Sequence, residues 1–240
     1  MNNRRMDPYM VMFLALMLFF GIRQGMYSAS PREWLLEKLF ILPGIVIGLS
    51  VHEFAHADVA YRLGDNTPLY QCRRTLNPAA HFDLVGFLAL IFVGFGWGRP
   101  VEIDPRNFKN PRSSELLVSL AGVVMNLITA VVFTLILKLY ISATGMMYVS
   151  MTTLTGIIYY MILYTIQINL VLMIFNLIPV PPLDGFNIVT EIFNLRKYSW
   201  YWNLYRYGWF ILMILIMFNF TDVVLNRGVE FFWGILAQLL

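Results

Sequence analysis

The sequence predicts an all-α polytopic membrane protein with about five to six transmembrane helices and a short re-entrant or β-strand segment at the membrane edge. Hydrophobic residues make up 59% of the 240 residues and charged residues only 13%, a balance that is unusual for a soluble domain. Several apolar stretches are long enough to cross a bilayer as a helix. Short polar turns separate them, so we expect residues 1–240 to form a single integral-membrane domain.

Charge and cysteine content limit the partners and the kinds of metal site. The formal net charge is only +3 and the basic residues lie mainly in polar turns, so we expect no nucleic-acid binding. Cys72 is the only cysteine, which excludes an intramolecular disulfide and a cluster of thiolate ligands. A metal site in this chain must therefore use histidine, aspartate or glutamate.

The N-terminal part of the chain contains two expected membrane segments. Two arginines precede an apolar run, Tyr9–Ile22. We interpret this run as an uncleaved first membrane segment, because Pro31 follows the small residues that could otherwise form a cleavage site. Ser30 is placed to cap a helix that begins at Pro31 and first lies at the interface. The second segment, Leu39–Leu63, is long enough to span the bilayer.

The middle of the chain is expected to contain the membrane-edge segment. The apolar stretch Phe82–Phe95 has fourteen residues, which is too short for a spanning helix, so we expect it to be re-entrant or interfacial. The next residues, Arg99–Asp104, alternate in polarity and are interpreted as a β-strand. Such a strand could pair with an extended substrate.

The C-terminal half is expected to contain three further spans. A proline-rich break, Asn176–Gly185, lies between the second of these spans, Thr152–Ile178, and a short helix at Gly185–Leu195. We therefore divide the single integral-membrane domain into a core at 30–191 and C-terminal helices at 208–240. The three spans are Leu116–Tyr140, Thr152–Ile178 and Gly208–Leu225, and an apolar tail follows at Val229–Leu240.

The distribution of basic residues predicts the orientation in the membrane. If the N-terminus is cytoplasmic and Phe82–Phe95 returns to its own side, twelve of the seventeen Lys and Arg residues lie on the cytoplasmic side. Basic residues are enriched in cytoplasmic loops. We therefore expect a cytoplasmic N-terminus.

Two of the three histidines in the chain lie in the second segment at a spacing typical of metal ligands. His52 and His56 are four residues apart, so they share one face of a helix, and Glu53 follows the first of them. This H-E-x-x-H pattern is typical of zinc hydrolases, in which the histidines bind the metal and Glu is the general base. The alternative is a pair of histidines whose hydrogen bonds are satisfied by neighbouring residues.

A catalytic zinc ion usually takes a third protein ligand. Asp184 is the best candidate, because it lies at a helix break after a membrane span, although it could instead cap the short helix that follows. His81 and Asp83 are weaker candidates, since they could form a hydrogen-bonded pair in a loop. Asp58 lies about 200° around the helix from His52, so we expect it to pair with a basic loop residue or to extend toward the interface.

Five sequence motifs can now be compared with known families. They are His52-Glu53-Phe54-Ala55-His56, Leu76-Asn77-Pro78-x-x-His81-x-Asp83, Phe95-Gly96-Trp97-Gly98-Arg99-Pro100-Val101, Asn107-Phe108-Lys109-Asn110-Pro111-Arg112 and Asn176-x-x-Pro179-x-Pro181-Pro182-Leu183-Asp184-Gly185. Taken together, these motifs resemble the site-2 proteases, which are intramembrane zinc metalloproteases, and in particular their compact bacterial branch without PDZ or CBS modules. The resemblance covers about Ser30 to Glu191. Val123 and Phe186 depart from the pattern of the branch, which usually has proline and a second glycine there.

The resemblance implies a role for five residues. It implies that His52, His56 and Asp184 bind one Zn²⁺ per chain and that Glu53 is the general base. It also implies that Asn126 acts catalytically near the substrate carbonyl, for which a hydrogen bond between helices is the alternative.

The function expected from the motifs is hydrolysis of a peptide bond in or near the transmembrane segment of a single-span membrane protein, as in regulated intramembrane proteolysis. We expect the protein to lie in the lipid bilayer of a bacterial plasma membrane, as a monomer or an oligomer. Two other classes would use the same histidines, a zinc transporter or sensor and a catalytically silent scaffold. Of the three, only the hydrolase needs Glu53.

Overall fold

The computed structural model describes Phe19, Arg23 and residues 30–93, 96–145 and 150–240. These residues are mostly helical and contain no β-strand. The expected first segment, Tyr9–Ile22, lies outside the described residues apart from Phe19. In chain order the elements are α2 (Pro31–Arg62), α3 (Thr67–Tyr70), α4 (Pro78–His81), α5 (Leu84–Val93), η1 (Pro105–Asn107), α6 (Pro111–Thr144), α7 (Leu154–Leu177), α8 (Asp184–Phe193), η2 (Leu195–Lys197), α9 (Ser199–Met217), α10 (Phe220–Leu236) and η3 (Ala237–Leu239).

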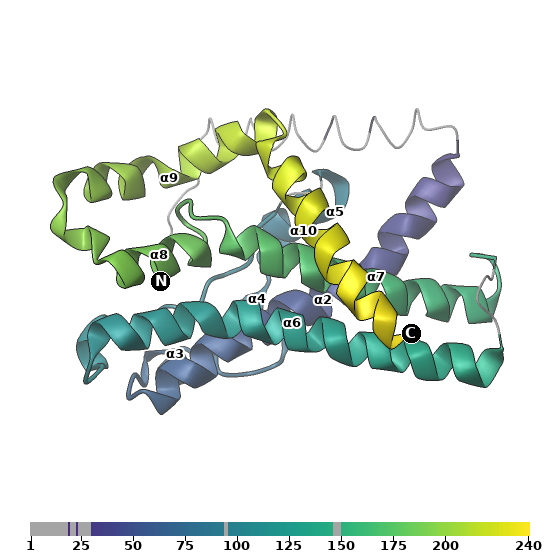
Figure 1. The fold of residues 1–240 in the computed structure, drawn as a ribbon, viewed down its shortest axis with the longest axis horizontal. Coiled ribbons are helices and arrows are strands. Elements are labelled where there is room, and N and C mark those ends of the chain that lie inside the picture. Colours follow the sequence, from purple (N-terminus) through teal and green to yellow (C-terminus); the bar gives the residue numbers. More distant parts are fainter. Residues whose placement is uncertain (1–18, 20–22, 24–29, 94–95, 146–149) are drawn as a thin grey trace.

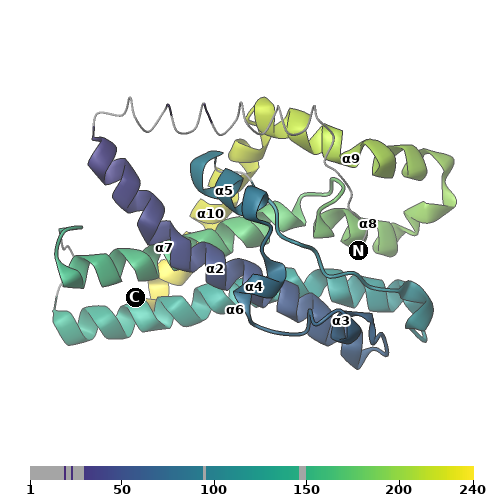
Figure 2. The same cartoon turned by 180° about the vertical axis from the view of Figure 1, so that it is seen from behind.

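The long helices form three layers. Helices α6 and α7 lie side by side at the centre, and α2 crosses one face of this pair while α10 packs on the other face (Figures 1 and 2). Small and apolar buried residues fill the space between α6 and α7. They include Ala130, Leu137, Ile166 and Leu170. Helix α7 therefore contacts α2, α6 and α10, and a side chain in the middle of α7 can interact with α2 and α6 together.

Three helices of the described chain are long and apolar enough to cross a membrane, or up to four if the bent pair α9 and α10 counts as one span. The three are α2, α6 and α7, which contain the expected spans Leu39–Leu63, Leu116–Tyr140 and Thr152–Ile178 almost entirely. The chain is thus a multi-pass membrane protein.

Helix α2 is a single continuous element. Its start is the predicted one, because the Ser30 side chain accepts a hydrogen bond from the Glu33 N–H and Pro31 occupies the first turn. Helix α2 continues through Pro43, so the segment that begins at Pro31 and the expected span form one helix, and the interfacial position of its first part stays a prediction. A Cβ added at Gly48 would lie 2.6 Å from the Leu172 side chain, so this glycine allows α2 to lie close against α7.

The expected span Gly208–Leu225 is wrong as a single straight helix. Helix α9 ends at Met217, α10 begins at Phe220, and the two are bent by 74°. The break lies at Asn219, whose φ of 58° is left-handed. Asparagine adopts this conformation more readily than most residues and ends the α-helical hydrogen-bond pattern there.

The β-strand expected at Arg99–Asp104 is not confirmed. The described residues contain one isolated bridge in this region, between Phe82 and Gly98. The backbone N–H groups of Val101 and Asp104 donate to side-chain carboxylates and so pair with no neighbouring strand. The adjacent helix α5 has ten residues, about 15 Å at 1.5 Å per residue, so it does not span a bilayer and its re-entrant placement stays a prediction.

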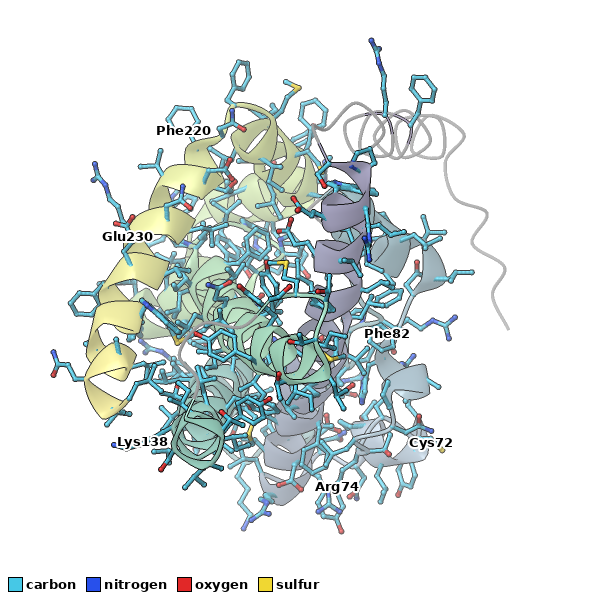
Figure 3. All side chains as sticks on the ribbon, turned by 90° about the vertical axis from the view of Figure 1, so that its right-hand side faces the viewer. Cys72, Arg74, Phe82, Lys138, Phe220 and Glu230 are labelled. Atoms are coloured by element: carbon cyan, nitrogen blue, oxygen red, sulfur yellow. The ribbon has the colours of Figure 1, made fainter. Side chains whose placement is uncertain are left out.

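The C-terminus is anchored on the central layer. Figure 3 shows α10 along one flank of the bundle, with Phe220 and Glu230 projecting outward and Lys138 of α6 beneath its end. The Lys138 ammonium donates a 2.7 Å hydrogen bond to the Leu239 carbonyl. The loops that carry Cys72, Arg74 and Phe82 lie on the opposite flank.

Candidate metal centre

Three ligand-type side chains meet inside the protein at the junction of α2 and α8. His52 Nε2 and His56 Nε2 are 3.0 Å apart, and Asp184 Oδ2 lies 3.2 and 3.3 Å from them. Both histidines are buried, with 5% and 8% of their surface exposed. Their rings meet edge to face, with an interplanar angle of 88°. Among the described residues, these are the only three that form such a cluster.

The geometry of this triangle fits a tetrahedral zinc ion. Zinc bonds to nitrogen and oxygen are about 2.0–2.1 Å long, so two ligand atoms of a tetrahedral site lie about 3.3 Å apart. All three edges are close to that value. In addition, Asp184 Oδ2 is buried and makes no ordinary hydrogen bond, which leaves it available as a ligand. The donor set of two imidazoles and one carboxylate is typical of catalytic zinc, which keeps a fourth position for water.

The outer nitrogens of the histidines are held by oxygen atoms of α6. His52 Nδ1 lies 2.7 Å from Oδ1 of Asn126, and His56 Nδ1 lies 2.7 Å from the Val118 carbonyl. A carbonyl or amide oxygen can only accept a hydrogen bond. Each Nδ1 therefore carries the hydrogen, and each Nε2 keeps its lone pair toward the cluster. Gly122 lies on the same face of α6, and a Cβ there would come within 2.5 Å of His52 Cε1.

Helix α8 brings Asp184 to the histidines. Leu183 is the N-cap residue of α8 and Asp184 is the first residue of the helix, so Asp184 does not occupy the capping position.

The far end of α8 is fastened to α6. Arg112 donates hydrogen bonds of 2.5 and 2.7 Å to the carbonyls of Glu191 and Ile192. Arg196 forms ion pairs with the buried carboxylates of Glu115 and Glu191. Charged donors at the C-terminal carbonyls of a helix are favourable, so these contacts fix the helix whose first residue is Asp184.

Glu53 lies beside the triangle and makes a different contact. Its Oε2 accepts a 2.9 Å hydrogen bond from the Val101 backbone N–H. Glu53 and His52 line one cavity of about 400 Å³ together with apolar side chains that include Trp97, Leu172 and Trp209. Glu53 is therefore placed next to the metal-ligand cluster without belonging to it.

Asn126 lies behind His52 and away from that cavity. Its side chain is completely buried, and its amide N–H₂ donates to the Gly48 carbonyl at 3.1 Å and to Asn169 Oδ1 at 3.0 Å. Both amide hydrogens are thus used, and in this arrangement none is available to a substrate oxyanion. The geometry matches the alternative of a hydrogen bond between helices.

The weaker candidates make structural contacts. His81 Nε2 lies 2.7 Å from the Thr75 carbonyl, and Asp83 accepts from two backbone N–H groups at the start of α5. The two do not form the expected pair with each other. Asp58 is bound by Arg62 at 2.6 Å and by Arg74 at 2.7 Å, which confirms the pairing expected for it.

Three contributors to the site are not among the candidates from the sequence. Asn169, which the sequence presents as one polar residue inside a span, contacts Asn126. The Val118 carbonyl and the Val101 N–H belong to the backbone and therefore have no residue-type signal. Polar residues within apolar helices are usually functional or paired, and this signal could have selected Asn169.

This fold and site define a class: a multi-pass membrane protein with an H-E-x-x-H helix, whose two histidines meet one aspartate in a cluster that could hold a metal and whose glutamate lies beside that cluster, as in metal-dependent peptidases. The model of Peptidase family M50 matches residues 40–218. The chain belongs to this family and is a zinc metalloprotease.

Relatives from bacteria carry names of the same kind. The chain is 39% identical over 197 residues to "Putative zinc metalloprotease YwhC" of Bacillus subtilis, which covers 80% of this chain and 89% of the relative. It is 27% identical over 163 residues to "Putative zinc metalloprotease Rip2" of Mycobacterium tuberculosis, covering 66% and 59% of the two chains. The Rip2 protein of Mycolicibacterium smegmatis is 23% identical over 195 residues, with 79% and 71% covered. No solved structure matches significantly.

Proposed function

We propose that this protein hydrolyses a peptide bond in or near the transmembrane segment of a single-span membrane protein, as a regulated intramembrane protease. One observation carries the proposal. Glu53 and His52 lie in a helix that is long and apolar enough to span the bilayer, and both line the same cavity. A transporter or sensor would need the ligands but no carboxylate base beside them.

The residues of the site have separate tasks in this reaction. His52, His56 and Asp184 would hold zinc, which when bound supplies an activated water and polarises the scissile carbonyl. Glu53 takes the proton of the attacking water and later delivers it to the leaving amine. The Val101 N–H holds one oxygen of the Glu53 carboxylate, and we assign the proton transfer to the other oxygen.

Two adjoining cavities support an extended substrate segment. The cavity beside Glu53 shares Leu49, Trp97 and Leu172 with a second cavity of about 520 Å³ that continues to the bend between α9 and α10. Both are lined mainly by apolar side chains, which suit an unwound membrane segment. The stretch Arg99–Asp104 is our candidate for pairing with that segment.

The proposed pairing of Arg99–Asp104 with the substrate can be tested by a proline substitution. Among the described residues the Ile103 N–H forms no hydrogen bond, so a proline there breaks none, and it removes only part of the packing of Ile103 against Ala60, Phe108 and Val118. Ile103→Pro should abolish cleavage and leave zinc content unchanged. Normal cleavage by this variant would remove the pairing.

The decisive experiment compares wild type with Glu53→Gln. Both proteins are purified in detergent, assayed for zinc and incubated with a panel of single-span membrane proteins. We expect one zinc per chain in both and cleavage only by wild type. Zinc in both without cleavage in either would favour the transporter, and metal uptake into vesicles would then be measured. Absence of zinc from both would show that the histidines are structural.

We further propose that the protein lies in a bacterial plasma membrane with a cytoplasmic N-terminus, supported by the bacterial relatives and the excess of basic residues on that side. The exposed thiol of Cys72 provides the test. A membrane-impermeant maleimide should label it only after the cells are permeabilised. In Cys72→Ser/Ser150→Cys the new thiol lies at the opposite end of the α6–α7 pair and should be labelled in intact cells. The reverse pattern would invert the topology.

A further inference from the structure

We propose that Asn169 is a positioning residue of the metal centre, which acts through Asn126 to hold His52 in the tautomer that presents Nε2 to zinc. The inference rests on the proposed role of His52 as a metal ligand. It assigns a task to a polar side chain in the middle of α7 that contacts neither metal nor substrate.

The orientation of the Asn169 amide is fixed by its own helix. Its Nδ2 donates a 2.8 Å hydrogen bond to the carbonyl of Thr165, one turn earlier in α7. Since that carbonyl can only accept, the nitrogen of the amide must face it. The oxygen of Asn169 therefore points away from the Thr165 carbonyl, toward α6 and Asn126.

Asn126 is in turn oriented by two acceptors. One amide hydrogen goes to Asn169 Oδ1 at 3.0 Å and the other goes to the Gly48 carbonyl at 3.1 Å. With both hydrogens used, the Asn126 oxygen must face the remaining neighbour, which is His52 Nδ1 at 2.7 Å. Hydrogen-bond direction is thus transmitted from α7 through α6 to α2.

The consequence at His52 is a defined tautomer. An amide oxygen can only accept, so His52 Nδ1 must carry the hydrogen and Nε2 keeps the lone pair that binds metal. If the Asn126 amide turned over, its N–H₂ would face His52, and the proton would move to Nε2. Asn126 and Asn169 are both fully buried, so water does not offer an alternative partner.

The other histidine shows why a relay is needed at His52. His56 Nδ1 contacts the Val118 carbonyl directly. A backbone carbonyl inside a helix cannot turn over, and its direction needs no further support. A side-chain amide has two orientations that differ little in shape. Asn169 supplies one of the two contacts that exclude the wrong orientation of Asn126.

The test uses Asn169→Leu, which has a similar volume and no polar atoms. Thr134→Val is the matched control, because Thr134 lies in α6, is equally buried, and among the described residues its hydroxyl bonds only to the Ala130 carbonyl of the same helix. Zinc affinity of each purified full-length protein is measured by competition with a chelator. We expect Asn169→Leu to bind zinc about tenfold more weakly than wild type and Thr134→Val to match wild type.

A second readout follows the tautomers directly. Zinc-free protein labelled with ¹⁵N-histidine gives signals from only three histidines, each assigned by single substitution at a pH where the imidazoles are neutral. Wild type should show the Nδ1–H tautomer at His52 and His56, and the Nε2–H tautomer at His81, whose Nε2 contacts a carbonyl. In Asn169→Leu, only the His52 signal should change to a mixture of tautomers.

The outcomes separate the relay from the metal centre. Wild-type affinity and an unchanged His52 signal in Asn169→Leu would overturn the relay while leaving the zinc site intact. A change at His52 and His56 together would show general loosening of the helices and would also overturn it. Absence of zinc from wild type would overturn the proposed function itself, and the relay with it.

Discussion

The backbone N–H of Val101 donates a 2.9 Å hydrogen bond to Oε2 of Glu53, across 48 positions of sequence. This contact joins the loop after α5 to the H-E-x-x-H helix. It holds one oxygen of the carboxylate beside the loop, whose residues Gly98 and Pro100 line the same cavity as Glu53. A side chain in a long helix thus depends on a loop for its orientation.

Removing the Val101 donor should slow catalysis without affecting metal binding. A hydrogen bond to a charged group contributes about 1.5–3 kcal/mol, so Val101→Pro should lower kcat/KM about tenfold to a hundredfold. Val101→Ala keeps the N–H and should retain most of the activity. Cleavage rates and zinc content would be measured for both. Equal rates in the two variants would show that this hydrogen bond does not orient the base.

Gly122 should be required for zinc binding because of the space it leaves. A Cβ at this position would lie 2.5 Å from His52 Cε1 and 2.6 Å from His56 Nε2. Overpacking costs about 1–3 kcal/mol, so Gly122→Ala should weaken zinc binding about tenfold, measured by chelator competition. Gly234→Ala in α10 is the control, since nothing lies within 4 Å of its Cβ. Unchanged affinity in Gly122→Ala would mean that the histidines can move away.

Loss of Arg196 should destabilise the α6–α8 junction. Arg196→Met leaves the buried carboxylates of Glu115 and Glu191 without their shared cation. Breaking a fully buried pair costs about 3–5 kcal/mol. Because Arg196 is partly exposed, we expect about 2 kcal/mol, or a Tm in detergent lower by about 4–8 °C. Arg106→Met breaks an exposed pair with Asp104 and should leave Tm unchanged. Similar Tm values for the two variants would contradict a structural role of Arg196.

Asp65 should make stability depend on pH in the acidic range. This buried residue follows α2 and accepts hydrogen bonds from the Asp104 N–H and the Asn107 amide. Burial opposes its charge, but bonds from Thr67, Asp104 and Asn107 outweigh burial and hold the pKa of Asp65 below its usual range.

A depressed folded-state pKa stabilises the fold above the unfolded value of about 3.9, and this contribution is lost as pH falls through the folded pKa. Asp65→Asn should therefore lower Tm at pH 7, and its difference from wild type should shrink below about pH 4. Tm measured from pH 7 to pH 3 checks this. A difference that is constant over this range would show that the charge of Asp65 is irrelevant.

Side-chain periodicity explains which parts of the site could be predicted. His52 and His56 are neighbours on any α-helix, and the proline-rich break before Asp184 places a carboxylate where backbone is irregular. The approach of α8 to α2 depends on packing at α6, which the sequence does not encode in a local pattern. The same holds for the Val101 contact, because every residue except proline offers the same N–H.

The bend at Asn219 shows the limit of hydropathy. The residues on both sides are apolar, so a hydropathy window over Gly208–Leu225 passes through the break without a signal. One left-handed residue changes the direction of the chain by 74°. The predicted role of Asn126 shows that a chemical role is equally hard to predict from sequence, because the residue type alone does not show which groups its amide will contact.

The distance in sequence between the metal ligands also affects the synthesis of the protein. His52 and His56 leave the ribosome early, whereas Asp184 follows only after more than half of the chain has been made. The complete ligand set cannot exist until α8 has folded back against α2 and α6. We therefore expect the newly made protein to be inactive while its first helices enter the membrane, and metal loading to be a late step of its biogenesis.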